Sequence, residues 1–368
     1  MSNVWLKRLS ARDFRNFARL DVELPETGLA IVGENGQGKT NLLEGIYYLQ
    51  VLRSVRGARD QDLVSFGAKG FHLSASVVSR GASEVSAGFE TSSKKKKVSL
   101  DGVGVARLSE AFGALPSVMF SPRDIQLVAG GPAERRRYLD LVLALSSKRY
   151  LFALQNYRSA LARRNAALRD AARNGDESAV AVWEPALAEQ GSVLIAERAA
   201  WVRDRSPEFA RLAAAIGEEG ESRMAYHSAL ARESDPRSAL AESLARQRKH
   251  DMRRGVTHSG PHREDLALTL DGKDLRVFGS AGQQRTAAIA LRMLEGATLQ
   301  ESGGLSPVLL LDDPFAELDL RRSARILGLL ASAGLGQTVL VVPRAADIPP
   351  ELTSLDRRSI HGGVISAQ

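Results

Sequence analysis

A glycine-rich loop constrains this 368-residue chain more than any other feature. The loop follows the apolar run 29–32 and precedes a helical pattern with Leu42, Leu43 and Ile46 on one side. It consists of Gly33, Glu34, Asn35, Gly36, Gln37, Gly38, Lys39 and Thr40. This order fits G-x-x-x-x-G-K-[ST], and a strand before it and a helix after it are the context that the motif requires. The sequence therefore predicts a phosphate-binding loop rather than a flexible glycine turn.

The residue types of the loop indicate a nucleoside triphosphate. Glycines let the backbone wrap so that its N–H groups face phosphate oxygens, and the positive end of the following helix adds to this field. Lys39 can reach the β- and γ-phosphates, and the Thr40 hydroxyl can bind Mg²⁺. We expect Asn41, the next residue, to belong to the same ATP site.

A second apolar run, residues 308–311, ends in Asp312 and Asp313. Beside the phosphate-loop strand, it would place Asp312 to hold Mg²⁺ directly or through water. Asp313 would then orient or deprotonate the attacking water. The alternative is that Asp313 only caps a helix, which Pro314 also fits.

A third motif lies between these two, at residues 278–285. Here Ser280, Gly282 and Gln283 precede a helical pattern, and the string resembles the signature loop of ABC ATPases. In that family the signature of one protomer binds the γ-phosphate held by the other. Residues 316–319, ending in Asp319, match the D-loop of the same family. Taken alone, Ser-x-Gly-Gln would more often be an ordinary helix cap.

The remaining pattern predicts the organisation of the chain. Residues 4–24 and 71–100 alternate as antiparallel strands do, and the last part alternates helices with buried strands. Residues from Pro132 to about 250 are helical, and we expect breaks at Gly175, Pro185, Pro207, Gly217 and Pro236. The prediction is an α/β ABC-type head with a β-rich and a RecA-like part, plus a helical second lobe without a long coiled coil. The expected divisions are 1–120, 121–255 and 256–368.

Further strings resemble one ABC family, RecF, the bacterial DNA replication and recombination-repair proteins. They are residues 13–17, 38–44, 53–54, 120–122, 130–132, 135–140, 164–168 and 260–266. The resemblance implies a head related to those of SMC proteins, weak DNA-stimulated ATPase activity, and an ATP-dependent homodimer that binds duplex DNA. It also implies a preference for junctions with a single-stranded gap, where the family acts with RecR and RecO to load RecA.

Two departures from the family pattern bear on hydrolysis. Arg123 stands where the family usually has glutamate, and the strand 338–342 runs into Pro343 and Arg344 where ABC proteins commonly carry a switch histidine. We therefore expect slow turnover, suited to resetting a dimer.

The formal net charge of +7 fits a polyanionic partner but equally a merely soluble basic protein. The helical part is rich in arginine, and we expect DNA contacts there. The candidates are Arg135, Arg136, Arg137, Arg163 and Arg164. A solvated arginine face is the competing interpretation. The run Lys94 to Lys97 fits a solvated hairpin better than a phosphate contact.

Other features of the sequence exclude several classes of protein. The chain has no cysteine, and His258 and His262 lack the neighbours of a metal site. The first residues do not resemble a signal peptide and no apolar run is long enough to span a bilayer, so we expect a cytoplasmic protein without membrane partners. A transporter ATPase subunit, a P-loop kinase and an SMC-like tether are the rival interpretations. Stimulation of ATPase activity or of dimerisation by DNA would distinguish a RecF-like protein from a P-loop kinase.

Overall fold

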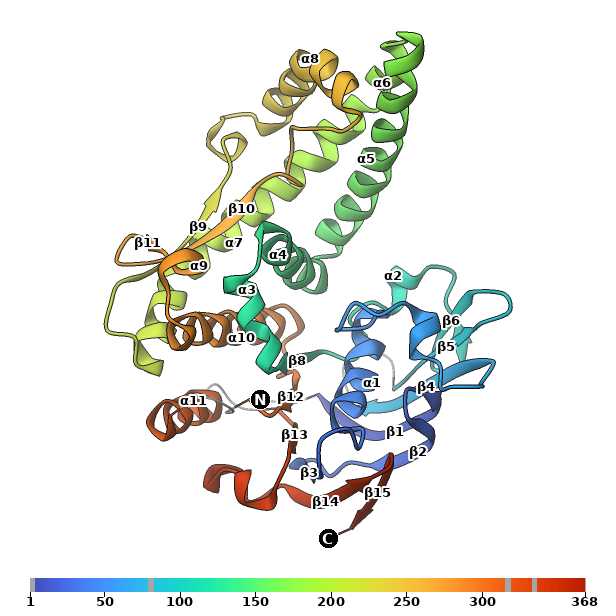
Figure 1. The fold of residues 1–368 in the computed structure, drawn as a ribbon, viewed down its shortest axis with the longest axis vertical. Coiled ribbons are helices and arrows are strands. Elements are labelled where there is room, and N and C mark those ends of the chain that lie inside the picture. Colours follow the sequence, from blue (N-terminus) through green and yellow to red (C-terminus); the bar gives the residue numbers. More distant parts are fainter. Residues whose placement is uncertain (1–3, 79–82, 315–318, 333–335, 368) are drawn as a thin grey trace. The chain divides into compact units, whose positions relative to one another are not determined.

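The computed structural model describes residues 4–78, 83–314, 319–332 and 336–367 (Figure 1). The chain forms two compact units. The first contains residues 1–124 and 292–368, and the second contains residues 125–291. Within the described residues, no helix combines the length and the apolar character needed to cross a bilayer.

The first unit contains two six-stranded sheets. One is antiparallel, in the order β2-β1-β4-β5-β6-β7. Its strands are β1 (Trp5–Phe14), β2 (Phe17–Glu23), β4 (Gly70–Val78), β5 (Glu84–Glu90), β6 (Lys95–Leu100) and β7 (Val103–Gly104). Its inner face buries alternate side chains, and Phe71 packs edge-on against Phe14 and Tyr48 with ring centroids 5.3 and 5.4 Å apart.

The other sheet carries the phosphate loop and has the order β15-β14-β3-β13-β12-β8. Its strands are β3 (Gly28–Val32), β8 (Ser117–Phe120), β12 (Val308–Asp312), β13 (Thr338–Val342), β14 (Asp356–His361) and β15 (Val364–Ala367). All pairs are parallel except β14 with β15. The three central strands are almost continuously buried, as parallel strands covered on both faces require.

Helix α1 (Lys39–Val51) packs against strands of both sheets, and eleven of its residues are buried. This explains its apolar sequence on more than one side. The unit also contains α2 (Leu108–Ala111), α11 (Leu320–Ser332) and the C-terminal part of α10 (Ala281–Gly303).

The second unit is mainly helical. Its helices are α3 (Gln126–Ala129), α4 (Pro132–Ser146), α5 (Lys148–Asn174), α6 (Ser178–Ala181), α7 (Glu184–Ile216), α8 (Pro236–Arg254), α9 (Leu275–Phe278) and the start of α10. A three-stranded antiparallel sheet, β11-β10-β9, completes it, with β9 (Ser222–His227), β10 (Asp265–Leu270) and β11 (Lys273–Asp274).

Two expectations about this part need correction. Pro207 does not end a helix but lies inside α7. Apolar residues on both sides of it, including Trp201 and Phe209, are buried, and their packing offsets the lost backbone hydrogen bond. The other breaks fall where expected: Gly175 and Gly217 follow helix ends, and Pro185 and Pro236 lie in first turns.

The division of the chain also differs from the expected one. The second unit extends to residue 291 instead of ending at 255. The physical reason is strand pairing, because β10 forms its ladder with β9 from the helical part of the chain. Residues 280–283 therefore belong to the second unit and not to the C-terminal part of the head.

Candidate nucleotide-binding site

The phosphate loop connects the end of β3 to the start of α1, as its sequence predicts. Gly36 and Gly38 have φ of 83° and 113°, a region that favours glycine. The amino group of Lys39 lies within the loop and donates to the carbonyl oxygens of Gly33 and Glu34, the latter at 2.9 Å. Burial lowers the pKa of Lys39, whereas the charges of Asp312 and Asp313 oppose this shift.

Asp312 and Thr40 are brought together from positions 272 residues apart. Thr40 Oγ1 donates to Asp312 Oδ1 at 3.0 Å. The strand β12 does not lie directly beside β3 as expected, because β13 lies between them, but the carboxyl ends of β3 and β12 still meet at the same edge of the sheet. Burial raises the pKa of Asp312. A hydroxyl and a carboxylate are oxygen ligands of the kind that Mg²⁺ takes, so the pair fits the predicted ion.

Asp313 follows in the left-handed region with φ of 46°. Its backbone N–H donates to the carbonyl of Val341 at 3.0 Å, which extends the parallel ladder by one residue. Aspartate adopts this left-handed region more readily than most residues, and Asp101 and Asp271 do so as well. The conformation redirects the chain directly after the strand that carries Asp312.

The side chains of Asn41 and Gln37 face protein groups. Asn41 donates to Asn16 Oδ1 at 2.8 Å and accepts from Arg56. The Gln37 side chain accepts from the N–H of Gly362 at 2.7 Å. Glu34 and Asn35 are exposed.

Three residues behind the loop were not predicted as site residues. The carbonyl of Gln37 accepts from Asn16 Nδ2 and from the N–H of Gly363, both at 3.0 Å. Because the C=O and the next N–H of a trans peptide point in opposite directions, these bonds direct the N–H of Gly38 away from Asn16. Asn16 lies in a string that the family resemblance had identified, but Gly362 and Gly363 had no sequence signal beyond a glycine turn.

The predicted signature forms the N-terminus of α10 in the second unit. The Gln283 side chain accepts from the Ser280 N–H at 2.9 Å, and Ser280 Oγ accepts from the Gln283 N–H at 3.3 Å. This reciprocal pair is a capping box, so the helix-cap interpretation holds for the isolated chain. Ser280 is exposed and Gly282 half-buried.

The D-loop residues Ala316, Glu317 and Leu318 lie outside the described residues. Asp319, the last of the predicted string, is exposed at the start of α11. Its carboxylate accepts from the Arg322 N–H at 2.8 Å, and this bond lowers its pKa.

Two of the five predicted DNA contacts must be corrected. Arg164 has no exposed surface, and it binds Asp251 at 2.8 Å and Glu184 at 3.0 Å. Arg135 is 5% exposed and pairs with Asp265 at 2.7 Å. Both guanidinium groups are occupied inside the unit, because an arginine removed from water needs a carboxylate partner.

The other three arginines reach the surface to different degrees. Arg136 is half-buried and donates to the carbonyl of Glu264 at 2.8 Å, and burial lowers its pKa. Arg137 is exposed beside Glu134 at 3.1 Å. Arg163 is exposed over the Trp183 ring at 5.1 Å.

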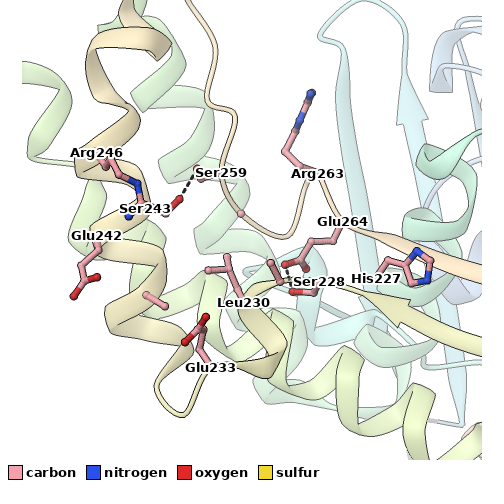
Figure 2. Close-up of a pocket in the computed structure, with 13 residues that line it drawn as sticks. His227, Ser228, Leu230, Glu233, Glu242, Ser243, Arg246, Ser259, Arg263 and Glu264 are labelled. Carbon is pink, nitrogen blue, oxygen red and sulfur yellow. Dashed lines mark hydrogen bonds between the residues drawn. The ribbon is translucent and has the colours of Figure 1, made fainter.

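The string 260–266 borders a cleft of about 490 Å³ in the second unit. Figure 2 shows Glu264 directed towards Ser228, to which it is hydrogen-bonded, whereas Arg263 extends in another direction. Two exposed arginines line this cleft, namely Arg263 and Arg246, of which Arg246 belongs to α8. His262 bonds the hydroxyl of Tyr157 at 2.7 Å and the Thr257 carbonyl at 2.9 Å, as expected for a histidine of a tight turn.

Comparison with known proteins settles the family. A family model described as the RecF/RecN/SMC N-terminal domain matches residues 5–348. The DNA replication and repair protein RecF of Symbiobacterium thermophilum is 37% identical over 334 residues, which cover 88% of each chain. This chain belongs to the RecF family. The RecF of Chloroflexus aggregans is also 37% identical, over 96% of this chain and 97% of its own.

Solved structures agree with the family and the fold. A RecF–ATP structure, described as a recombination mediator of the RecFOR pathway, has a TM-score of 0.90 and 29% identity. The match covers 100% of this RecF-family chain and 98% of the chain in that structure. The Smc head domain of Pyrococcus furiosus, at 18% identity, has a TM-score of 0.57 over 99% of this chain and 95% of its own. The predicted ABC-type α/β head is thereby confirmed.

Proposed function

We propose that this chain binds Mg·ATP in the first unit and that ATP joins two copies head to head. The observation that carries this proposal is the Thr40–Asp312 hydrogen bond beside Lys39. It supports a triphosphate site with two halves, one from the loop and one from the acidic strand. RecF relatives at 37% identity and a RecF–ATP structure support the nucleotide.

Thr40 and Asp312 would hold the Mg²⁺ ion. The ion would supply charge neutralisation at the phosphate oxygens. Lys39, which here binds carbonyls of its own loop, would exchange them for the β- and γ-phosphates. The exchange keeps its ammonium group hydrogen-bonded in both states, so little desolvation is added on binding.

Asp313 would orient or deprotonate the water that attacks the γ-phosphate. It follows the Mg²⁺ ligand directly, and its left-handed backbone turns it out of the strand. Asp319 would assist from across the dimer. Arg344 follows β13 where a switch histidine is common, and it pairs with Asp347 at 2.8 Å. We infer slow hydrolysis, whose product state separates the dimer.

Ser280, Gly282 and Gln283 would cap the γ-phosphate bound by the partner copy. The N-terminus of α10, a helix of 23 residues, presents its positive end there. The Ser280 hydroxyl is exposed and accepts only a long, 3.3 Å bond from within the helix cap, so rotation towards a phosphate costs little.

Closure of the dimer would couple ATP binding to DNA binding. We propose that the chain binds duplex DNA at single-strand gap junctions and, with RecO and RecR, promotes RecA loading in the cytoplasm. Support comes from the relatives, which are DNA replication and repair proteins, and from the RecFOR pathway of the solved structure. Arg137 and Arg163 are the remaining exposed candidates of the helical unit, whereas Arg136 is half-buried and donates to the Glu264 carbonyl.

The test is a titration with a fluorescent ATP analogue, with and without Mg²⁺, on wild type, Lys39→Met and Asp312→Asn. Lys39→Met should abolish binding, and Asp312→Asn should remove the Mg²⁺ dependence. Lys69→Met is the matched control, because Lys69 is an exposed lysine of the same unit. Unchanged binding in Lys39→Met would refute the site.

A further inference from the structure

A row of basic residues crosses the antiparallel sheet of the first unit. In the strand register, Arg12 of β1 stands opposite Arg19 of β2 on one side and His72 of β4 on the other. His72 stands opposite Gly88 of β5, and Gly88 opposite Lys97 of β6. We call Arg19, Arg12, His72 and Lys97 the basic row.

The basic row lies on the outer face of the sheet. Its four side chains are exposed, whereas the strand neighbours Ala11, Leu20, Leu73 and Val98 are buried on the other face. Lys96 shows the contrast, because it points inward, binds Asp60 at 2.9 Å and lies 5.1 Å from the Tyr48 ring centre.

The arrangement works against the stability of the sheet. Like charges directly opposite on adjacent strands repel, and Arg12 stands opposite Arg19. Among the described residues, no acid lies within ion-pair distance of Arg12, Arg19 or Lys97. Arg8, on the same face, does pair with Asp21. Partial burial and the Arg12 charge lower the pKa of His72.

The surroundings of the basic row suit a phosphate backbone. The next row on the same face consists of Asp21, Ser10, Ser74, Ser86 and Ser99, in that strand order. Serine hydroxyls donate to phosphate oxygens. Ser10 already donates to Asp21 at 3.0 Å and Ser86 bonds Ser99 at 2.6 Å, so these hydroxyls would have to exchange partners for a phosphate. The His72 ring lies beside Gly88, where a Cβ would be 3.4 Å from its Nδ1. The glutamates of this face, Glu23, Glu84 and Glu90, lie outside both rows, and Asp21, the acid of the second row, is paired with Arg8.

The length of the basic row matches several phosphates. Adjacent strands are about 4.8 Å apart, so the four intervals from Arg19 to Lys97 span roughly 19 Å. Duplex DNA carries one charge per about 1.7 Å of its axis. A contact of this kind reads no bases, because all donors address the backbone.

We propose that the basic row is a binding surface for the phosphate backbone of duplex DNA, distinct from the exposed arginines of the helical unit. This inference rests on the proposed DNA-binding function. It assigns a role to the first unit that the nucleotide site does not supply.

The test is the salt dependence of binding to a blunt duplex, measured by fluorescence anisotropy with ATP between 50 and 200 mM salt. The variant is Arg12→Gln/Arg19→Gln/Lys97→Gln. Loss of three phosphate contacts should lower the slope of log K against log salt by about 2.7, since each contact contributes about 0.9. Arg8→Gln/Asp21→Asn is the matched control and should leave the slope unchanged, because it removes the exposed ion pair without changing the net charge of the face.

Stability and ATP binding separate lost contact from lost fold. The triple variant should melt no lower than wild type, because it removes a like-charge pair, and it should bind ATP equally well. An unchanged slope in the triple variant, with salt-dependent binding by wild type, would overturn the basic row alone. If wild type binds no duplex, the DNA function itself fails. Vesicles with an anionic lipid form the last arm: loss of vesicle binding with intact duplex binding would overturn the proposal in favour of a membrane surface.

Discussion

Arg164→Met should destabilise the helical unit without removing a DNA contact. The Arg164 side chain is fully buried and binds Asp251 and Thr257 at 2.8 Å and Glu184 at 3.0 Å. Methionine retains the length and apolar stem of the side chain but leaves Asp251, itself fully buried, with the His258 ring and backbone as partners. Breaking a buried ion pair in this way costs about 3–5 kcal/mol.

Thermal unfolding measures this loss. In a unit of this size, spanning residues 125–291, each kcal/mol shifts Tm by about 2–4 °C, so Arg164→Met should lower it by roughly 6–20 °C. Arg163→Gln is the matched control one residue earlier. Arg163 is exposed over the Trp183 ring, so Tm should stay near that of wild type.

DNA binding well below Tm completes the comparison. Folded Arg164→Met should keep its affinity for duplex DNA, whereas Arg163→Gln should weaken it if Arg163 contacts a phosphate. An Arg164→Met variant with the Tm of wild type but without DNA affinity would refute the structural role of Arg164. Such a result would mean that the arginine leaves its carboxylate partners to contact DNA.

Two further predictions concern the phosphate loop and the helical unit. Gly363→Ala places a Cβ 2.7 Å from the Asn16 carbonyl oxygen at φ of 83°, and strain of about 1–2 kcal/mol should weaken ATP binding roughly 5- to 30-fold. Ser366→Ala, in the same hairpin, should bind ATP as wild type does in the same titration. Equal affinities of both variants would contradict the inference that the Gly363 turn orients the Gly38 N–H of the phosphate loop. Burial lowers the pKa of His262 to about 4, below its ordinary value near 6.5. The neutral ring is therefore favoured in the folded state, and the unit should lose stability as pH falls from about 6.5 towards 4, a dependence that urea unfolding should show to be smaller in His262→Gln.

The sequence predicted the central strands and the loop accurately. Runs 29–32, 308–311 and 338–342 became β3, β12 and β13 within one residue at each end. These strands are buried on both faces, so their sequences are continuously apolar and hard to misread. The association of Thr40 with Asp312 was also predictable, because the carboxyl ends of parallel strands meet at one edge of a sheet. The sequence had suggested that β12 lies directly beside β3, but β13 lies between them.

Arginines were harder to predict. Arg135 and Arg164 occur in a basic stretch, and nothing near them in the chain shows that they are buried. Their partners Asp265, Glu184 and Asp251 lie 20 to 130 residues away, and only the folded unit brings them together. The same holds for Gly363, whose contact with Gln37 crosses most of the chain.

The most direct test of the ATP-driven dimer is molar mass by light scattering, with and without ATP and gapped DNA. The proteins are wild type, Asp313→Asn and Ser280→Arg. ATP should double the mass of wild type, DNA should strengthen the dimer, and Asp313→Asn should trap it because hydrolysis no longer separates the copies. Ser280→Arg should bind ATP and stay monomeric. A constant mass in all three proteins despite active ATP turnover by wild type would contradict the dimer, since each chain would then hydrolyse ATP alone.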